Sequence, residues 1–238
     1  MAETAVQEPK LKTQEPLFGT KERKLLIDPL NENNPITVQV LGICSALAVT
    51  SLVYPSVVMA IAVIFVLAFS NLFTSLLRKS IPKQVRMIVQ LVIIASLVTV
   101  VELTLKAVNF EVYKQLSVFI GLIITNCIIM GRLEAFAMAN RPWRSFLDGI
   151  GNGLGYGAIL IVVALFRELF GKGSLFAGSS LEMKIIGPST EYWLNSTNGW
   201  LSWYQNNNLM VLSGAAMFII GIIIWIHRSW NPKLVDVS

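Results

Sequence analysis

Two cysteines are the residues of this chain best suited to bind a metal centre. Cys44 lies in the apolar stretch 41–49 and Cys127 in the apolar stretch 122–131, and they are the only cysteines among the 238 residues. Thiolates are soft ligands that suit iron–sulfur clusters, which normally take four of them. The chain therefore offers half of the ligands of one cluster. A partner chain built in the same way would have to supply the other two.

Two other interpretations of the cysteines stay open at this level. A buried free cysteine is most often a small apolar residue that fills space in the core. A disulfide between Cys44 and Cys127 is disfavoured at membrane depth in a protein that faces the cytoplasm. The matching places of the cysteines in two similar halves of the chain, described below, add weight to the metal interpretation, although core packing stays the more common role of such cysteines.

The residues next to both cysteines suit a cluster. Gly42 and Ser45 are small, so a cluster could approach the backbone beside the first cysteine. Thr125 and Asn126 precede the second cysteine and could donate hydrogen bonds to sulfur, which tunes the reduction potential of such a centre. The sequence thus predicts a metal site with these four residues around its two thiols.

The composition is that of an integral membrane protein. Hydrophobic residues make up 54% of the chain and charged residues 14%, against about 25% charged in soluble domains, and the mean hydropathy is +0.64. Spanning helices satisfy their own backbone hydrogen bonds in lipid, so an all-α membrane fold is expected. The net charge of +5 comes from basic residues between apolar runs, which set membrane topology and do not indicate nucleic-acid binding.

Six apolar runs divide the chain into two halves of three runs each. They cover roughly residues 36–53, 56–77, 87–105, 115–131, 150–170 and 209–226. The first run of each half is short for a span, which takes about 20 helical residues, and each of these runs contains a cysteine. Short spans at corresponding places of two halves are typical of inverted repeats with a site near the midplane. We therefore predict six transmembrane helices in two inverted three-helix repeats, each beginning with a short or broken helix that carries a cysteine.

The predicted repeats define the domains and the topology. A polar cytoplasmic tail covers residues 1–35, the first repeat covers 36–110, and the second covers 111–238 with an extracytoplasmic loop at about 171–208. Most of the 19 Lys and Arg residues lie in the tail, after runs two and four, and at the C-terminus. The positive-inside rule then places both termini in the cytoplasm. The tail is expected either to be disordered or to form a short amphipathic helix near residues 21–30 that lies on the membrane or on a partner.

A run of alternating glycines leads into the fifth apolar run. It lacks the Gly-Lys-Ser/Thr ending of a phosphate-binding loop. On a helix, Gly149, Gly153 and Gly157 would share one face, and Gly151 and Gly155 would share another. Small residues at such spacing let membrane helices pack closely, so the run predicts helix packing and not a ligand site.

Acidic residues near the spans are candidates for an ion path, because an ionisable group at membrane depth usually has a function. Glu102 and Asp148 are the favoured positions. Glu102 can instead pair with a lysine one turn later. Glu134 is expected to pair with a nearby arginine, and Glu168 beside Arg167 to mark the membrane interface. No nucleophilic triad is present in the sequence, so no catalytic residue is assigned to this chain.

Four stretches of the chain resemble a family of membrane subunits. They are residues 41–50, 124–137, 146–157 and 166–171, and the resemblance covers roughly residues 36–230. The family contains the D subunit of the sodium-translocating NADH:quinone oxidoreductase (Nqr) and the related E subunit of the Rnf complex. A Cys-Pro pair is associated with the Rnf branch in the first stretch, whereas Ser45 follows the cysteine here, which favours the quinone reductase.

The resemblance implies a non-autonomous subunit of a Na⁺-transporting NADH:ubiquinone reductase, a multi-pass translocase component of the bacterial inner membrane. In this family the D subunit pairs with a homologous E subunit of opposite topology, and both share a 2Fe–2S cluster held by two cysteines from each. Those of this chain would be Cys44 and Cys127. FAD, FMN and riboflavin are bound only by other members of the complex, which include the A, B, C and F subunits. The complex passes electrons to ubiquinone and exports Na⁺.

Three alternatives remain at the level of sequence. An Rnf-type subunit would serve the same relay between ferredoxin and NAD. A small inverted-repeat transporter or channel would have no redox role. A purely structural assembly subunit would have none either. Both of the latter predict a protein without iron that tolerates serine at both cysteines.

Overall fold

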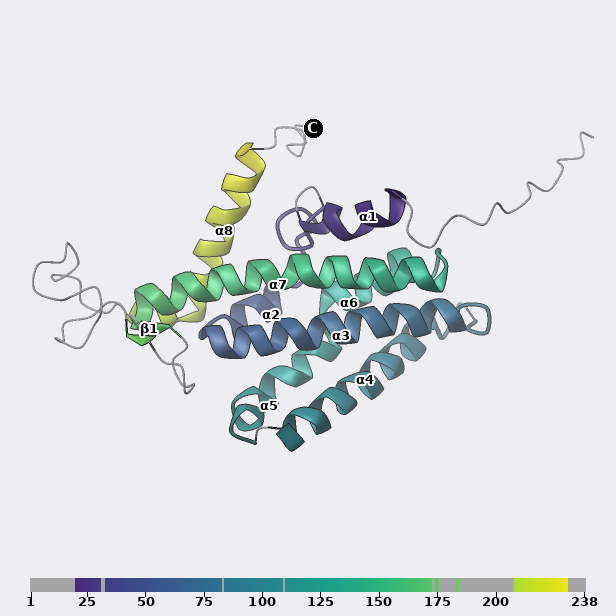
Figure 1. The fold of residues 1–238 in the computed structure, drawn as a ribbon, viewed down its shortest axis with the longest axis horizontal. Coiled ribbons are helices and arrows are strands. Elements are labelled where there is room, and N and C mark those ends of the chain that lie inside the picture. Colours follow the sequence, from purple (N-terminus) through teal and green to yellow (C-terminus); the bar gives the residue numbers. More distant parts are fainter. Residues whose placement is uncertain are drawn as a thin grey trace, which may run out of the picture.

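The computed structural model describes residues 20–30, 33–82, 84–108, 110–172, 174–175, 183–184 and 208–230. Within these residues the chain is almost entirely helical (Figure 1). Most of the predicted tail and most of the predicted loop at 171–208 lie outside the described part. The short elements are α1 (Thr20–Ile27), η1 (Asp28–Leu30), η3 (Asn208–Val211) and an antiparallel pair of two-residue strands, β1 (Ser174–Leu175) and β2 (Met183–Lys184).

Four helical segments in the described residues are long and apolar enough to cross a membrane. They are α3 (Val53–Leu77), α4 (Arg86–Val108), the segment Leu116–Ala137 and α7 (Pro142–Lys172). A further apolar helix, α8 (Ser213–Trp230), is shorter. The prediction of a helical membrane protein is therefore confirmed. Six spans and an inverted repeat are not established by these helices and remain predictions.

The first apolar run forms only a seven-residue helix, α2 (Ile43–Val49). Directly before it, Val40 and Gly42 have φ angles of 57° and 79°, and this left-handed region does not occur within a right-handed helix. After it, Leu52 is extended before α3 begins. Backbone breaks on both sides therefore limit the helix that carries Cys44 to about two turns.

The fourth apolar run is broken directly before Cys127. α5 (Phe110–Ile124) ends, and Asn126 is extended with ψ of 121° before α6 (Cys127–Arg132) begins. α6 continues into the π-helix η2 (Leu133–Ala137), a rare element that is frequent at functional sites. Each cysteine of the chain thus lies in the first turn of a short helix.

The centre of the molecule is the antiparallel pair of α3 and α7 (Figure 1). A Cβ placed on Gly149 would lie 2.7 Å from the Cα of Ala68, and one on Gly153 would lie 2.9 Å from the Cα of Ile64. A Cβ on Gly157 would also touch α3. Any larger residue at the first two positions would push the backbones apart, so the predicted packing role of this glycine face is confirmed.

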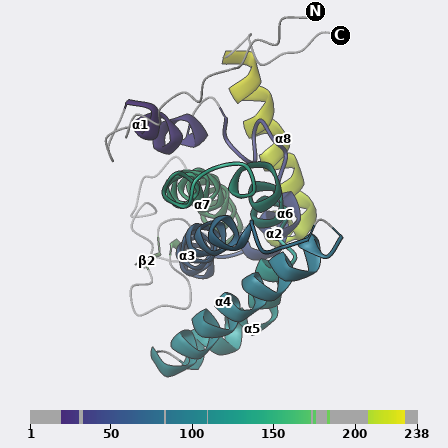
Figure 2. The same cartoon turned by 90° about the vertical axis from the view of Figure 1, so that its right-hand side faces the viewer.

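The second glycine face of α7 holds the N-terminal segment α1–η1. A Cβ on Gly151 would collide with the carbonyl oxygen of Leu25, and one on Gly155 with that of Pro29. The Nδ2 of Asn34 donates to the carbonyl oxygen of Gly155 at 3.2 Å. The helix expected near residues 21–30 is formed, and it lies on α7 of its own chain (Figure 2). The predicted domain boundaries are not tested by this contact.

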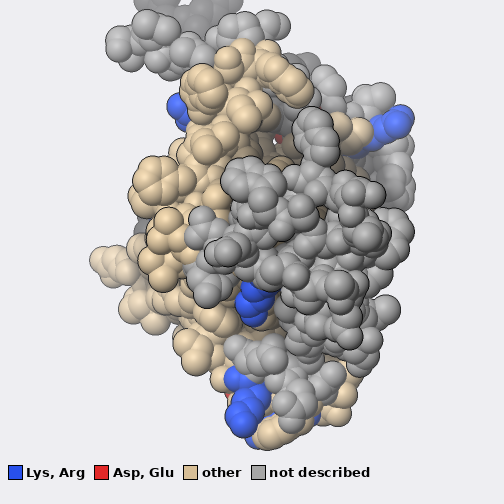
Figure 3. Space-filling view, turned by 90° about the vertical axis from the view of Figure 1, so that its left-hand side faces the viewer, with Lys and Arg blue, Asp and Glu red and all other residues tan. Residues whose placement is uncertain are grey.

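The remaining helices complete the layers. In Figure 2, α1 covers one side of α7, α3 covers the other, and α4 with α5 lies beyond α3. α4 exposes large apolar side chains such as Met87, Ile88 and Val92, as expected for a helix that faces lipid. Figure 3 views the end of the molecule where α7 ends and shows Lys and Arg side chains at several separate places among the described residues.

Candidate metal centre

Both predicted ligands are free thiols at the surface of the described structure. Cys44 is the second residue of α2 and Cys127 is the first residue of α6. Both are exposed, and neither forms a disulfide. A cysteine that only fills space in the core would be buried, whereas an exposed thiol can share a metal with ligands from another chain.

The structure brings the two segments that carry the cysteines into contact. A Cβ placed on Gly42 would lie 3.3 Å from Oδ1 of Asn126, and one placed on Gly131 would lie 3.2 Å from Cδ1 of Leu41. Gly42 and Asn126 are the N-cap residues of α2 and α6. The two short helices therefore begin side by side.

Asn126 has a buried hydrogen-bond donor without a partner. Its Oδ1 accepts from the backbone N–H of Ile128 at 3.4 Å, and the residue is 3% exposed. Its Nδ2 has no hydrogen-bond partner among the residues that the structure describes. An unsatisfied buried donor costs about 1–3 kcal/mol, and Cys127 is the next residue in the chain. Thr125, also predicted near the site, is exposed at the break before α6.

Tyr156 of α7 is not among the residues that the sequence predicts for the site. It is 0% exposed, and its hydroxyl oxygen lies 2.6 Å from Oγ of Ser45. Its ring touches Gly42, where a Cβ would lie only 2.9 Å from Cε2. The one sequence signal for this residue is that a phenol interrupts the glycine run.

The two thiols do not form a complete metal site among the residues that the structure describes. Among the described residues, no group of three or more His, Cys, Asp or Glu side chains could hold a metal ion. A cluster at Cys44 and Cys127 would therefore need ligands from beyond the described residues. The chemistry of the donor set, two thiols and an unsatisfied N–H donor, fits an iron–sulfur group.

Asp148 forms a buried ion pair. It is 1% exposed, and its carboxylate accepts from Arg132 of α6, with Nε at 3.0 Å from Oδ2 and a second bond from Nη2 to Oδ1. Asn152 donates to the same Oδ1 at 3.0 Å, while its own Oδ1 has no partner among the described residues. The predicted ion-path residue thus lies in a polar network between α6 and α7.

A polar pocket of about 240 Å³ opens at this network. Its wall combines the N-terminal segment with α6 and α7, through Leu25, Asp28, Pro29, Asn33, Gln39, Arg132, Asp148 and Asn152. The N-terminal segment therefore forms one side of the pocket that contains the ion pair.

Glu102, the other predicted ion-path residue, lies in a different part of the molecule. It accepts a hydrogen bond from the hydroxyl of Tyr113 at 3.0 Å, and Lys106 lies 5.6 Å from the centre of the Tyr113 ring. The bond to the Glu102 carboxylate raises the pKa of Tyr113 above its ordinary value, because the carboxylate stabilises the protonated phenol. These residues belong to α4 and α5, whereas the Asp148 network lies between α6 and α7.

The other acidic residues have specific partners. Glu134 pairs with Arg86 of α4 and accepts from Nε2 of Gln90 at 3.3 Å. The arginine partner thus comes from α4, whereas the sequence suggested an arginine close to Glu134 in the chain. Both partners come from the first two turns of α4, more than 40 positions before Glu134, and sequence separation does not reveal such a contact.

Arg167 and Glu168 do more than mark the membrane interface. They are 1% and 0% exposed. Nη1 of Arg167 donates to Oγ1 of Thr50 at 2.7 Å, and Nη2 donates to the carbonyl oxygen of Leu212 at 3.1 Å. Oε2 of Glu168 accepts from the backbone N–H of Val53 at 2.5 Å. The end of α7 therefore ties together the end of α2, the start of α3 and the segment before α8.

These features define an integral membrane protein of several apolar helices, with two free thiols at adjoining helix starts. The chain matches the family model described as "Rnf-Nqr subunit, membrane protein" over residues 23–224. It belongs to this family.

Three relatives, each named as the D subunit of a Na(+)-translocating NADH-quinone reductase, are similar over nearly their whole lengths. The protein of Psychromonas ingrahamii is 56% identical over 90% of this chain and 95% of its own length. That of Haemophilus ducreyi is 52% identical over 90% of this chain and 97% of its own length. That of Photobacterium profundum is 54% identical over 93% of this chain and 100% of its own length. The names favour the Nqr branch of the family over the Rnf branch.

Proposed function

We propose that this chain is the D subunit of a Na⁺-translocating NADH:quinone reductase and that it relays electrons without a catalytic residue of its own. Support comes from relatives of that name at 52–56% identity. The single observation that carries the relay role is the contact between the two helix starts, where both thiols are exposed and Asn126 has an unsatisfied donor.

In this proposal Cys44 and Cys127 hold one half of a 2Fe–2S cluster. A homologous E subunit of opposite topology supplies the other two cysteines. When bound, the cluster takes up and passes on single electrons between the flavins of the complex. FAD, FMN and riboflavin, and the reactions of NADH and ubiquinone, belong to the A, B, C and F subunits.

The residues around the thiols of this chain shape the site. Gly42 leaves room for the ring of Tyr156, so the start of α2 can lie directly against α7. Asn126 caps α6 through Oδ1 and offers Nδ2 to sulfur. Apolar neighbours such as Ile128 and Ile129 are fully buried and keep water from the inner side of the site, which affects the reduction potential.

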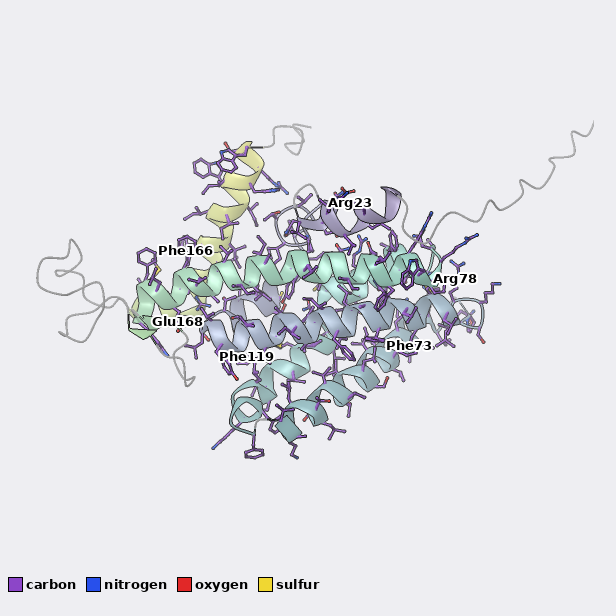
Figure 4. All side chains as sticks on the ribbon, in the orientation of Figure 1. Arg23, Phe73, Arg78, Phe119, Phe166 and Glu168 are labelled. Atoms are coloured by element: carbon purple, nitrogen blue, oxygen red, sulfur yellow. The ribbon has the colours of Figure 1, made fainter. Side chains whose placement is uncertain are left out.

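The proposal includes six spans in two inverted repeats, with α2 and the broken α5–α6 segment as the first helix of each. It places both termini in the cytoplasm of a bacterial inner-membrane protein. Support comes from the positive charge at the end of the α3–α7 pair where α3 ends and α7 begins. There Arg78 donates to the carbonyl oxygen of Asn140 at 2.8 Å. Arg141 and Arg144 follow there in the chain, and Glu168 lies at the opposite end of the pair (Figure 4). The positive-inside rule assigns the basic end to the cytoplasm.

The ion pair of Arg132 and Asp148 is the proposed link to sodium export. Helix α6 begins with Cys127 and ends with Arg132, so a shift of this short helix would move a thiol and the partner of Asp148 together. Asp148 would then change its partners in the polar pocket, and Na⁺ is the cation that such a carboxylate could accept at membrane depth. Glu102 is proposed as a second, separate position on the ion path.

Iron and acid-labile sulfide measured in the purified complex test the relay role. The variants Cys44→Ser and Cys127→Ser are each expected to remove the same amount, about one cluster's worth, while the other subunits remain bound. Ser51→Cys in the Cys44→Ser background is a matched control, because it restores the cysteine count at the far end of α2 and should not restore iron. Unchanged iron and normal quinone reduction in both serine variants would contradict the relay role.

A further inference from the structure

We propose that Tyr156 is a positioning residue that fixes the start of α2 through a hydrogen-bonded chain and thereby sets the reduction potential of the centre at Cys44 and Cys127. This inference rests on the proposed function, since it presupposes a redox centre held by the two thiols. It adds a residue from α7, outside both cysteine-bearing segments.

The position of Tyr156 connects three elements. The residue belongs to α7 and is 0% exposed. Its ring lies against the backbone of Gly42, where a Cβ would lie 2.9 Å from Cε2 of Tyr156 and 3.3 Å from Oδ1 of Asn126. Gly42 and Asn126 are the N-caps of the helices that carry Cys44 and Cys127. The side chain of Tyr156 therefore touches the residue that starts the helix of Cys44, and that residue lies next to the one that starts the helix of Cys127.

The direction of the hydrogen bonds follows from counting protons. Oγ of Ser45 donates its one proton to the carbonyl oxygen of Gly42 at 2.9 Å. The hydroxyl of Tyr156, 2.6 Å from the same Oγ, must then be the donor of that bond. The chain runs from Tyr156 to Ser45 to the Gly42 carbonyl and ends in the first turn of α2. Cys44 lies between the last two residues of this chain.

Packing alone does not explain why position 156 is a tyrosine. Phenylalanine would fill the same apolar space, and a buried hydroxyl must find a partner to avoid a desolvation cost. Here the hydroxyl finds its partner next to a cysteine. Because Gly42 has φ of 79° and no side chain, the start of α2 has little local stiffness. The hydrogen bond from Tyr156 to Ser45 holds the start of α2 against α7.

The test is a redox titration of the intact purified complex, followed by the electron paramagnetic resonance of the reduced cluster. The variants are Tyr156→Phe, Ser45→Ala and the double variant, with iron content measured in each. Tyr54→Phe is the matched control, since it removes the hydroxyl of a partly buried tyrosine on α3. Cys44→Ser, measured in parallel, reports whether the cluster belongs to this site at all.

The expected result is that Tyr156→Phe and Ser45→Ala retain iron and shift the midpoint potential and the spectrum in the same direction. The double variant should shift no further, because both changes break one chain. If iron is lost, it should be lost in both variants. A midpoint potential and spectrum of Tyr156→Phe equal to those of the wild type would overturn the inference. A double variant whose potential shift equals the sum of the two single shifts would overturn it as well. In either case, loss of iron in Cys44→Ser would leave the proposed function standing. Iron that persists in Cys44→Ser would overturn both.

Discussion

At the scale of single residues, nine buried side-chain nitrogen or oxygen atoms have no hydrogen-bond partner in the part of the chain that the structure describes. Two of these atoms lie at the two proposed sites: Nδ2 of Asn126 beside Cys127, and Oδ1 of Asn152 beside Asp148. Buried polar groups without partners are rare in folded proteins. These two are the atoms to which the proposed function assigns a partner, sulfur for Asn126 and a cation for Asn152.

The unpaired Nδ2 donor of Asn126 allows the sign of a shift in reduction potential to be predicted. Asn126→Asp keeps an oxygen that can cap α6 but replaces the N–H donor with a charged acceptor. Hydrogen bonds to sulfur stabilise the more negative, reduced state of a cluster, so the variant should lower the midpoint potential in a redox titration. Asn140→Asp makes the same chemical change at the start of α7 and should leave the potential unchanged. A potential in Asn126→Asp equal to or above that of the wild type would exclude this role.

The ion pair of Arg132 and Asp148 predicts an asymmetric effect on stability. Arg132→Gln leaves Asp148 as a buried charge without its partner, and breaking such a pair costs about 3 kcal/mol or more. The double variant Arg132→Gln/Asp148→Asn removes both charges and should recover most of that loss. Thermal unfolding of the complex, monitored by loss of subunit binding, measures the difference. Equal stability of the single and double variants would mean that the pair is not buried as described.

At the scale of elements, the short helices are positioned by α7, which presents a different face to each neighbour. Its first glycine face packs on α3, and its second holds the N-terminal segment. Tyr156 from the same helix touches Gly42, and Arg167 at its far end donates to Thr50. Both ends of α2 are therefore fixed by one long helix.

The second glycine face predicts how the N-terminal segment is held. Gly155→Ala would place a methyl group against the carbonyl oxygen of Pro29, and overpacking of this kind costs about 1–3 kcal/mol. The segment should then detach more often, and trypsin should cleave faster at Arg23. A Cβ on Gly121 of α5 would have no neighbouring atom of the described residues within 4 Å. Trypsin should therefore cleave the Gly121→Ala variant at Arg23 as slowly as the wild type. Equal rates in both variants would show that the segment does not depend on this contact.

At the scale of the whole molecule, the distribution of basic residues predicts the orientation in the membrane. Ser80 follows α3 at the basic end, and Lys172 ends α7 at the opposite end. In spheroplasts, a membrane-impermeant maleimide should label Lys172→Cys directly. It should label Ser80→Cys only after lysis. The reverse pattern would place the termini outside the cytoplasm.

Much of the architecture follows from the pattern of apolar residues and glycines. The long apolar helices α3, α4 and α7 and the packing face of Gly149, Gly153 and Gly157 are local features, because helical spacing alone decides which residues share a face. The seven-residue length of α2 was harder to predict, since it depends on left-handed backbone at Val40 and Gly42. Only glycine signals such a conformation in a sequence.

The contacts that complete the site could not be predicted from spacing. Tyr156 meets Ser45 across 111 positions of the chain, and Arg167 meets Thr50 across 117. Such pairs arise only when α7 packs beside α2, and a single sequence contains no signal for that distance. The residue types of the two cysteines, by contrast, indicate metal chemistry before any contact is known.

The most direct test of the central claim is a cryo-electron microscopy map of the intact complex that resolves side chains at Cys44 and Cys127. The proposed function predicts one continuous strong density that joins both sulfurs to two thiols of a partner subunit, with Nδ2 of Asn126 directed at it. Two separate thiol side chains with no density between them, in a complex that still reduces quinone, would contradict the claim.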